Sequence, residues 1–260
     1  MIKAPVLACL ATAFGVLLAS IADAQSIEAA RAALDEGRFV EATELAESLK
    51  TSEGYALAAR SLAIHGYHFA GDDEKQALFK RATQLAEEAV RLNPRNPDTH
   101  LQLAHALGRY TQTIDILEAF NKGYPEKVRE ALEAALRLEP DMAAAHFSLG
   151  SWHAEARHGG GVMAGILYGA SKEDALAHFA RALELAPQDK PTLYRYAHGL
   201  LLLDRDSNYR QAHDLLTRAV EIPSKDAYHR ITHKLAVELL EDLEAHPPEP
   251  PRNPARLGQP

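Results

Sequence analysis

A proline that closes an apolar helical stretch recurs along the chain and constrains the fold more than any other feature. The recurring phrases are Arg91-Leu-Asn-Pro94, Arg137-Leu-Glu-Pro140, Glu184-Leu-Ala-Pro187 and Glu221-Ile-Pro223, with prolines 46, 47 and 36 residues apart. Each phrase ends a segment with apolar residues at i, i+3, i+4 and i+7, the spacing of one helical face. Because proline cannot continue a helix, the pattern predicts repeated helix pairs separated by proline turns.

The first 24 residues have the features of a secretory signal. Lys3 supplies the positive charge, residues 4–20 are apolar, and Ala22-Asp23-Ala24 gives a small-x-small cleavage pattern before Gln25. We expect cleavage between Ala24 and Gln25 and a periplasmic or secreted mature protein. The alternative is an uncleaved N-terminal anchor, since an apolar run of about 17 residues is at the short limit for spanning a bilayer. No later segment is long and apolar enough to span one.

Composition excludes several classes of site. The single cysteine, Cys9, lies in the signal, so the mature chain offers no disulfide and no thiolate ligand. The net charge of −8 survives cleavage, because Lys3 and Asp23 cancel. Basic residues are interleaved with acidic ones, and such a surface repels phosphate backbones. We therefore expect no nucleic-acid partner.

The segment between Ala143 and Pro187 shows one repeat in full. It carries, in order, Leu149, Gly150, His153, Ala175, Phe179, Ala182 and Pro187. This order resembles the tetratricopeptide repeat, with His153 in place of the usual aromatic residue. Small residues at these positions let two helices approach, and Phe179 fills the space between them. The resemblance implies an all-α, tetratricopeptide-like helical-hairpin solenoid.

The rest of the chain fits the same register. We expect about five helix pairs in a domain spanning residues 25–245, starting with a short pair at 26–50 that breaks at Gly37-Arg38. Residues 226–245 are expected to form a C-terminal capping helix. Residues 246–260 contain six prolines and few apolar side chains, which is typical of a disordered or polyproline-like tail.

Two repeats are longer than the usual repeat of about 34 residues. Residues 109–124 (the first insert) and 154–171 each carry about a dozen extra residues by comparison with that norm. In the latter, residues 159–170 (the second insert) join a glycine run to an apolar stretch containing Val162, Met163, Ile166, Leu167 and Tyr168. These residues could cover a pocket for an apolar, lipid-like small ligand, dock on a second protein, or pack as a short helix against their own repeat.

The long inserts point to a more specific resemblance over residues 82–243. It is carried by Lys122-Gly123-Tyr124, by the run Ala145-His146-Phe147-Ser148-Leu149-Gly150-Ser151-Trp152, by Ser171-Lys172-Glu173-Asp174-Ala175-Leu176 and by Glu221-Ile222-Pro223. These segments resemble the tetratricopeptide domain of the regulator of microtubule dynamics family. Because the signal would take this chain out of the cytosol, we expect only the scaffold to be shared with that family.

A solenoid of helix pairs presents its first helices on a concave side, where it binds extended segments. By register, the groove-facing residues are expected to be Leu101, His105, Arg109, Phe147, Ser151, Glu155, Tyr194, His198 and Leu201. The alternative for each of them is an ordinary role in packing between repeats. The leading hypothesis is an exported scaffold or adaptor that binds a protein or peptide partner in this groove. The alternative is a carrier for an apolar ligand under residues 159–170.

No catalytic, cofactor or metal site is expected. His229 and His233 have zinc-compatible spacing but no glutamate between them and no evident third ligand, so we interpret them as solvated residues of the capping helix. The glycine run at 159–161 lacks the Lys-Ser/Thr pair of a phosphate loop. His146 and His153 are interpreted as packing residues between helices.

Overall fold

The computed structural model describes residues 27–248, and every regular element within that range is a helix. The predicted signal (residues 1–24) and the tail from residue 249 onward lie outside the described residues. Within residues 27–248, no helix combines the length and the apolar character needed to cross a membrane.

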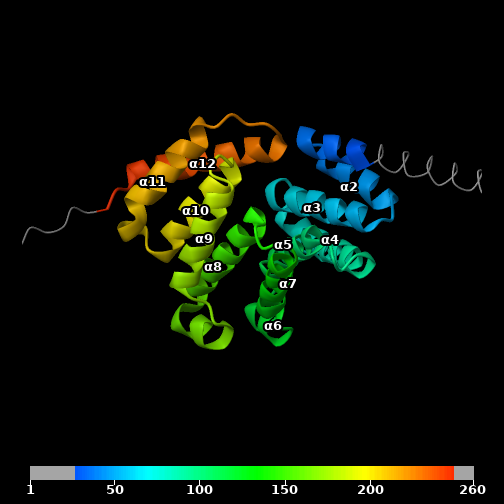
Figure 1. Cartoon of the computed structure of the whole chain (residues 1–260), viewed down its shortest axis with the longest axis horizontal. Helices are drawn as coiled ribbons and strands as arrows, with labels where there is room; N and C mark the ends of the chain where they lie inside the picture. The colour runs from blue at the N-terminus through cyan, green and yellow to red at the C-terminus, as the bar shows by residue number, and fades with distance from the viewer. Residues whose placement is uncertain (1–26, 249–260) are drawn as a thin grey trace, which may run out of the picture. The chain divides into compact units, whose positions relative to one another are not determined.

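The helices follow one another as pairs (Figure 1). After a helix at residues 27–36 come α2 (Phe39–Ser48), α3 (Ser52–His68), α4 (Asp72–Leu92), α5 (Pro97–Thr111), α6 (Ile116–Asn121), α7 (Tyr124–Leu138), α8 (Ala143–Tyr168), α9 (Lys172–Leu185), α10 (Lys190–Leu203), α11 (Arg205–Glu221) and α12 (Ala227–Ala245). With α6 as an extra element inside the α5–α7 pair, these form five pairs followed by the single helix α12. The predicted all-α solenoid of five pairs and a capping helix is confirmed.

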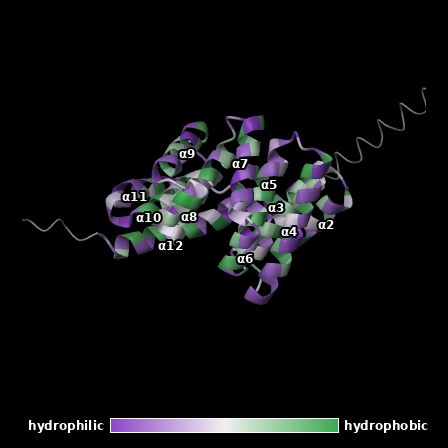
Figure 2. Ribbon diagram, turned by 90° about the horizontal axis from the view of Figure 1, so that it is seen from below, coloured by the Kyte–Doolittle hydropathy of each residue, from purple (hydrophilic) through white to green (hydrophobic). Residues whose placement is uncertain are grey.

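Polar side chains at the start of many helices explain where those helices begin. Such a residue accepts a hydrogen bond from a backbone N–H of the first turn, which would otherwise lack a partner. The capping residues are Thr51 for α3, Asn96 for α5, Asp115 for α6, Ser171 for α9, Asp189 for α10 and Asp204 for α11. Both apolar and polar residues occur on most helices, as Figure 2 shows, which is typical of helices with one buried face.

The chain divides into two compact units. One contains the residues up to Ala145 together with Asp226–Tyr228, and the other contains His146–Lys225 together with the residues from His229 onward. Each unit has a core of its own, and each is described separately below.

In the first unit, α3 and α4 approach closely through Gly66. A Cβ atom at Gly66 would lie 2.8 Å from Cε1 of Phe79, so no larger residue fits there without a shift of the ring. Phe79 is 2% exposed, and three alanines of α4 (Ala82, Ala86 and Ala89) are fully buried. The small residues therefore let the helices approach around a single large side chain.

The second unit repeats this arrangement with Phe179 at its centre. The ring of Phe179 lies against Gly150 of α8 and Gly199 of α10, where a Cβ on either glycine would collide with it. Phe179 also stacks on Tyr196, with ring centroids 5.1 Å apart. Ala175 and Ala182 are buried in the same core. The predicted role of Phe179 between small residues is confirmed, and Gly199 is an addition to it.

Candidate functional site: two inserts and a helical groove

The first insert forms α6, a six-residue helix with an exposed apolar face. Asp115 caps it by accepting hydrogen bonds from the backbone N–H groups of Leu117 (2.8 Å) and Glu118 (3.3 Å). The side chains of Ile116, Leu117 and Phe120 are 79%, 68% and 49% exposed. These three residues were not predicted from the sequence, although their spacing in Ile-Leu-Glu-Ala-Phe is a detectable apolar helical signal.

The second insert continues α8 beyond a sharp turn. The helix runs through the first two glycines of the run and breaks only at Gly161, whose φ of 54° and ψ of −135° suit glycine alone. Arg157 donates a hydrogen bond from Nη1 to the carbonyl oxygen of Gly161, at 2.5 Å. A helical segment then continues to Tyr168, and Gly169 ends it with a φ of 68°.

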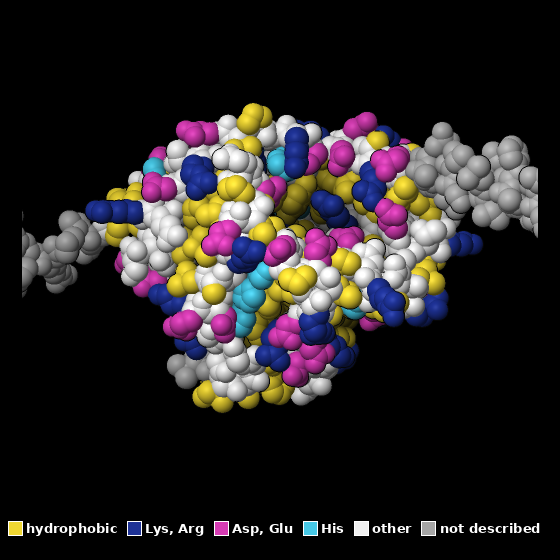
Figure 3. Space-filling model, in the orientation of Figure 1, with side chains coloured by type: hydrophobic (Ala, Val, Ile, Leu, Met, Phe, Trp, Pro, Cys, Tyr) yellow, Lys and Arg dark blue, Asp and Glu magenta, His cyan; other side chains and the backbone are white. Residues whose placement is uncertain are grey.

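This second segment also leaves its apolar side chains in solvent. Met163, Ile166 and Leu167 are 57%, 70% and 53% exposed, and Tyr168 is half-buried. The side chain of Val162 lies outside what the structure describes. Apolar side chains are visible at the lower edge of the face in Figure 3, where the last turns of α8 lie.

The two inserts contain many of the exposed large apolar side chains of the described residues. They supply six of the eleven large apolar side chains that are exposed there. Isolated exposed apolar residues are ordinary, but their concentration in a short segment is typical of an interaction site. The two inserts are therefore the strongest candidates for a binding surface.

In the first unit, the predicted groove residues line one side of α5. Leu101 is buried (3% exposed), while His105 and Arg109 are half-buried. The guanidinium of Arg109 lies over the ring of Tyr67 from α3, 3.6 Å from its centroid. This cation–π contact joins two successive first helices and involves Tyr67, which was not predicted from the sequence.

In the second unit, the predicted groove residues lie on α8 and α10. Phe147 is 6% exposed and belongs to the core, with the guanidinium of Arg195 4.6 Å from its ring centroid. Tyr194 is half-buried and lies 6.2 Å from His198, measured between ring centroids. Of the remaining predicted residues, Ser151 and Leu201 are half-buried, whereas Glu155 and His198 are exposed. The buried Leu101 and Phe147 offer little surface to a partner, and the groove assignment as a whole stays a prediction.

Three histidines of the second unit form a cluster between α8 and α9. The Nδ1 atoms of His146 and His178 are 2.9 Å apart, and the rings of His153 and His178 stack with centroids 6.0 Å apart. Burial lowers the pKa of His178 to about 4, and positive charge on His146 or His153 contributes to the lowering. These contacts agree with the predicted packing role of His146 and His153.

Within residues 27–248, no group of three or more histidine, cysteine, aspartate or glutamate side chains is arranged to hold a metal ion. His229 is 5% exposed, and its Nε2 lies 3.6 Å from Oδ1 of Asp189. The interpretation of His229 as a solvated residue is therefore wrong, because α12 packs this side of its first turns against the unit.

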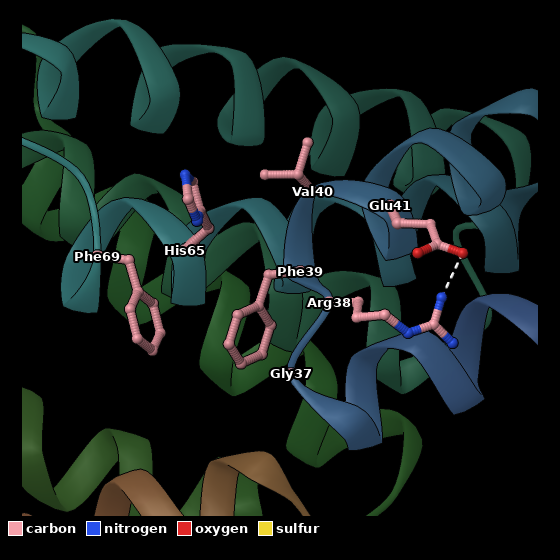
Figure 4. Close-up of a pocket in the computed structure, with 7 residues that line it drawn as sticks. All are labelled: Gly37, Arg38, Phe39, Val40, Glu41, His65 and Phe69. Atoms are coloured by element: carbon pink, nitrogen blue, oxygen red, sulfur yellow. Dashed lines mark ion pairs between the residues drawn. The ribbon is translucent and has the colours of Figure 1, made fainter.

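A small hollow in the first unit was not predicted from the sequence. It has a volume of about 430 Å³ and is lined by Gly37, Arg38, Phe39, Val40, Glu41, His65 and Phe69. The rings of Phe39 and Phe69 stack with centroids 5.4 Å apart, while Arg38 extends away from them to pair with Glu41 (Figure 4). Phe69 is 58% exposed, so this open hollow could accept one apolar side chain of a partner.

Comparison with protein-family models places the chain in a family. Residues 26–244 match the model described as Regulator of microtubule dynamics protein 1-3. The chain belongs to this family. The match spans all five helix pairs and all but the last residue of α12, so membership extends over both units and both inserts.

A solved structure agrees with the fold of this family member. The thermophilic TPR protein TTC0263 of Thermus thermophilus is similar with a TM-score of 0.60 at 20% identity, over 83% of this chain and 99% of that one. YrrB, a TPR protein described as having an unusual peptide-binding site, has a TM-score of 0.41 at 17% identity, over 83% and 90% of the two chains. At this identity the first likeness shows the fold alone. Among curated proteins, none matches the chain.

Proposed function

We propose that this protein is an exported adaptor that binds a protein or peptide partner, using the α8–α10 face and the second insert together. The observation that carries this proposal is the course of α8. The part of α8 before Gly161 carries the predicted groove residues Ser151 and Glu155, and the helical segment after Gly161 carries the exposed Ile166 and Leu167. A partner segment lying along α8 would therefore meet polar groups first and apolar side chains at its end.

The chemistry of this face suits a peptide. Glu155 and His198 supply exposed polar groups, and Tyr194 supplies an aromatic ring with a polar tip. Side chains of this kind position a backbone, whereas buried apolar contacts supply most of the affinity. Burying a leucine or isoleucine contributes about 1.5–3 kcal/mol, so the insert is expected to dominate binding.

The test uses a peptide selected from a displayed random library against the mature chain, with affinity measured by fluorescence anisotropy. The double change Ile166→Ser with Leu167→Ser is expected to weaken binding by more than about tenfold, since each 1.4 kcal/mol is a factor of ten. Tyr194→Ala is expected to weaken it less. Leu92→Ser is the matched control, because Leu92 is 41% exposed on α4 in the other unit. Equal affinities for all three variants would contradict the proposal.

The alternative is a carrier that shelters an apolar, lipid-like ligand under residues 159–170. A sheltered site needs apolar side chains that turn toward a common interior, but Met163, Ile166 and Leu167 are all more than half exposed. These exposures favour docking on a partner. Native mass spectrometry decides between the two, because a carrier would be purified with a bound lipid.

Export is a separate part of the proposal and rests on the sequence of residues 1–24. N-terminal sequencing of the mature protein from its own cells is the test. A first residue at Gln25 would support cleavage, and an intact N-terminus in the membrane fraction would support an anchor instead.

A further inference from the structure

The end of the second insert is attached to α8 through a histidine. The backbone N–H of Ser171, the residue that follows the insert, donates a hydrogen bond to Nδ1 of His153, at 3.2 Å. Ser171 also caps α9, because its Oγ accepts from the N–H of Asp174 (3.0 Å) and donates to Oδ2 of Asp174 (2.7 Å). One imidazole nitrogen therefore joins the end of the insert and the start of α9 to the middle of α8.

This hydrogen bond requires an unprotonated nitrogen. Nδ1 of His153 accepts from an N–H group, so it must carry a lone pair rather than a proton. Protonation would bring two N–H donors face to face and turn an attraction into a repulsion. His153 is 7% exposed and its ring forms a T-shaped contact with that of Trp152, so water cannot easily replace the lost partner.

Other titratable groups surround this nitrogen. The ring of His178 from α9 stacks on His153, and His146 of α8 contacts His178. The charged groups that act on His178 are these two imidazoles and Asp174 of its own helix. Burial and charge on the two α8 histidines lower the pKa of His178 to about 4.

The opposite end of the insert is attached by hydrogen bonds that acid does not remove. Arg157 donates to the Gly161 carbonyl at 2.5 Å, and arginine stays charged throughout. Nδ1 of His158 lies 3.1 Å from the carbonyl oxygen of Leu202, an acceptor, so this imidazole must donate and still donates when protonated. Acid is thus expected to affect only the Ser171 end.

We propose that the hydrogen bond between Ser171 and His153 is an acid-sensitive attachment, and that protonation of His153 releases the C-terminal end of the second insert. A role of this release in regulating partner binding rests on the proposed function. The release itself is a property of the free protein, because it concerns contacts within one unit.

Hydrogen exchange of the free mature protein between pH 7.5 and 4.5, corrected for intrinsic rates, is the test. Protection of the amides at 165–172 is expected to fall by about tenfold or more as the pH drops, as for the loss of one hydrogen bond. Protection at 117–121 in the first insert is expected to stay constant. No change at 165–172 would overturn the proposal.

Variants of His153 test whether its Nδ1 atom is the group that responds to acid. In His153→Asn the amide oxygen replaces Nδ1 as an acceptor that does not titrate, so protection at 165–172 is expected to be high at both pH values. His153→Leu removes the acceptor, and protection is expected to be low at both. His213→Asn on α11 is the control, because His213 contacts Glu244 and not the cluster. A pH dependence that survives in His153→Asn would overturn the assignment.

A measurement on the unmodified protein covers the case in which the variants do not fold. Long-range ¹H–¹⁵N spectra report which imidazole nitrogen carries the proton. Nδ1 of His153 is expected to be unprotonated at pH 7.5, and a protonated Nδ1 there would overturn the proposal. Neither the hydrogen-exchange experiment nor the NMR experiment needs a partner. A negative peptide-binding test would therefore not contradict the acid-sensitive attachment, and a negative result in these two experiments would not contradict peptide binding.

Discussion

In the first unit the insert forms a separate helix, α6, that its own residue Asp115 caps, whereas in the second unit the insert is a continuation of α8 that turns at Gly161. Each presents three exposed apolar side chains. Helix α6 itself is held by bonds between neighbours in sequence, such as the pair between Lys122 and Glu118 at 2.6 Å, although Gln76 also donates a hydrogen bond to the carbonyl oxygen of Thr113 ahead of it. The residues that flank the second make longer-range bonds, from Ser171 to His153, 18 residues apart, and between His158 and Leu202, 44 residues apart.

This difference shows that similar surfaces can depend on different parts of the fold. A helix held by local capping responds to changes in its own few residues. A segment held by distant partners responds to anything that moves the helices beneath it, including the protonation of a buried imidazole. The comparison therefore predicts which changes affect one insert and leave the other as it is.

Removal of the central ring of the second unit is expected to have the largest effect. Phe179→Ala is expected to lower the free energy of unfolding by about 3–5 kcal/mol, because a large cavity opens between Gly150 and Gly199. Hydrogen exchange should then increase at 162–168 more than at 117–121. Phe79→Ala is the matched control in the first unit. Similar loosening of both inserts by Phe179→Ala would show that the two are not held separately.

Removal of the side chains that cap α6 and α9 is expected to have an intermediate effect on the free energy of unfolding. Asp115→Ala and Ser171→Ala should each cost about 1 kcal/mol, the usual value for a helix N-cap. For α6, a helix of six residues, this is expected to cause loss of the helix, whereas the 14-residue α9 with its buried face should only fray. Amide exchange at Leu117 and Asp174 measures the two effects. Persistence of α6 in Asp115→Ala would contradict the local origin of its stability.

Acid is expected to lower the global stability through His178. Because the pKa of His178 is lowered from 6.5 to about 4, the unfolded chain binds this proton more readily than the folded one. The contribution of His178 to the free energy of unfolding is therefore fully present above pH 6.5 and is lost as the pH falls toward 4. Urea unfolding at several pH values measures it. His178→Asn should reduce the slope, and His198→Asn, at an exposed position, should not.

Polar substitutions on the insert surfaces are expected to have the smallest effect on stability. Ile116→Ser and Ile166→Ser should change the free energy of unfolding by less than about 0.5 kcal/mol, since both side chains are already exposed to water. Thermal unfolding monitored by circular dichroism measures this. A loss above about 2 kcal/mol in either variant would mean that the side chain packs against the protein in solution.

The sequence predicted the paired helices well because each decisive signal is local. Apolar spacing, the prolines after each second helix and the small residues around Phe179 all act within one repeat. The groove residues were harder to predict. Leu101 and Phe147 are buried because side chains from other helices cover them, and the sequence around each of the two residues does not indicate this. Arg195 lies over Phe147, and these two residues are 48 positions apart. No spacing rule within one helix reports such a contact.

What the sequence determined by itself is the order of helices, the positions of the two inserts and the small residues that let helices pack, because backbone propensity and periodicity are properties of neighbours. What only the tertiary structure decided is which side chains stay in water and which histidines meet. His146, His153 and His178 come together because two helices pack side by side, and the six exposed apolar residues of the inserts remain in solvent because no helix of their own unit covers them.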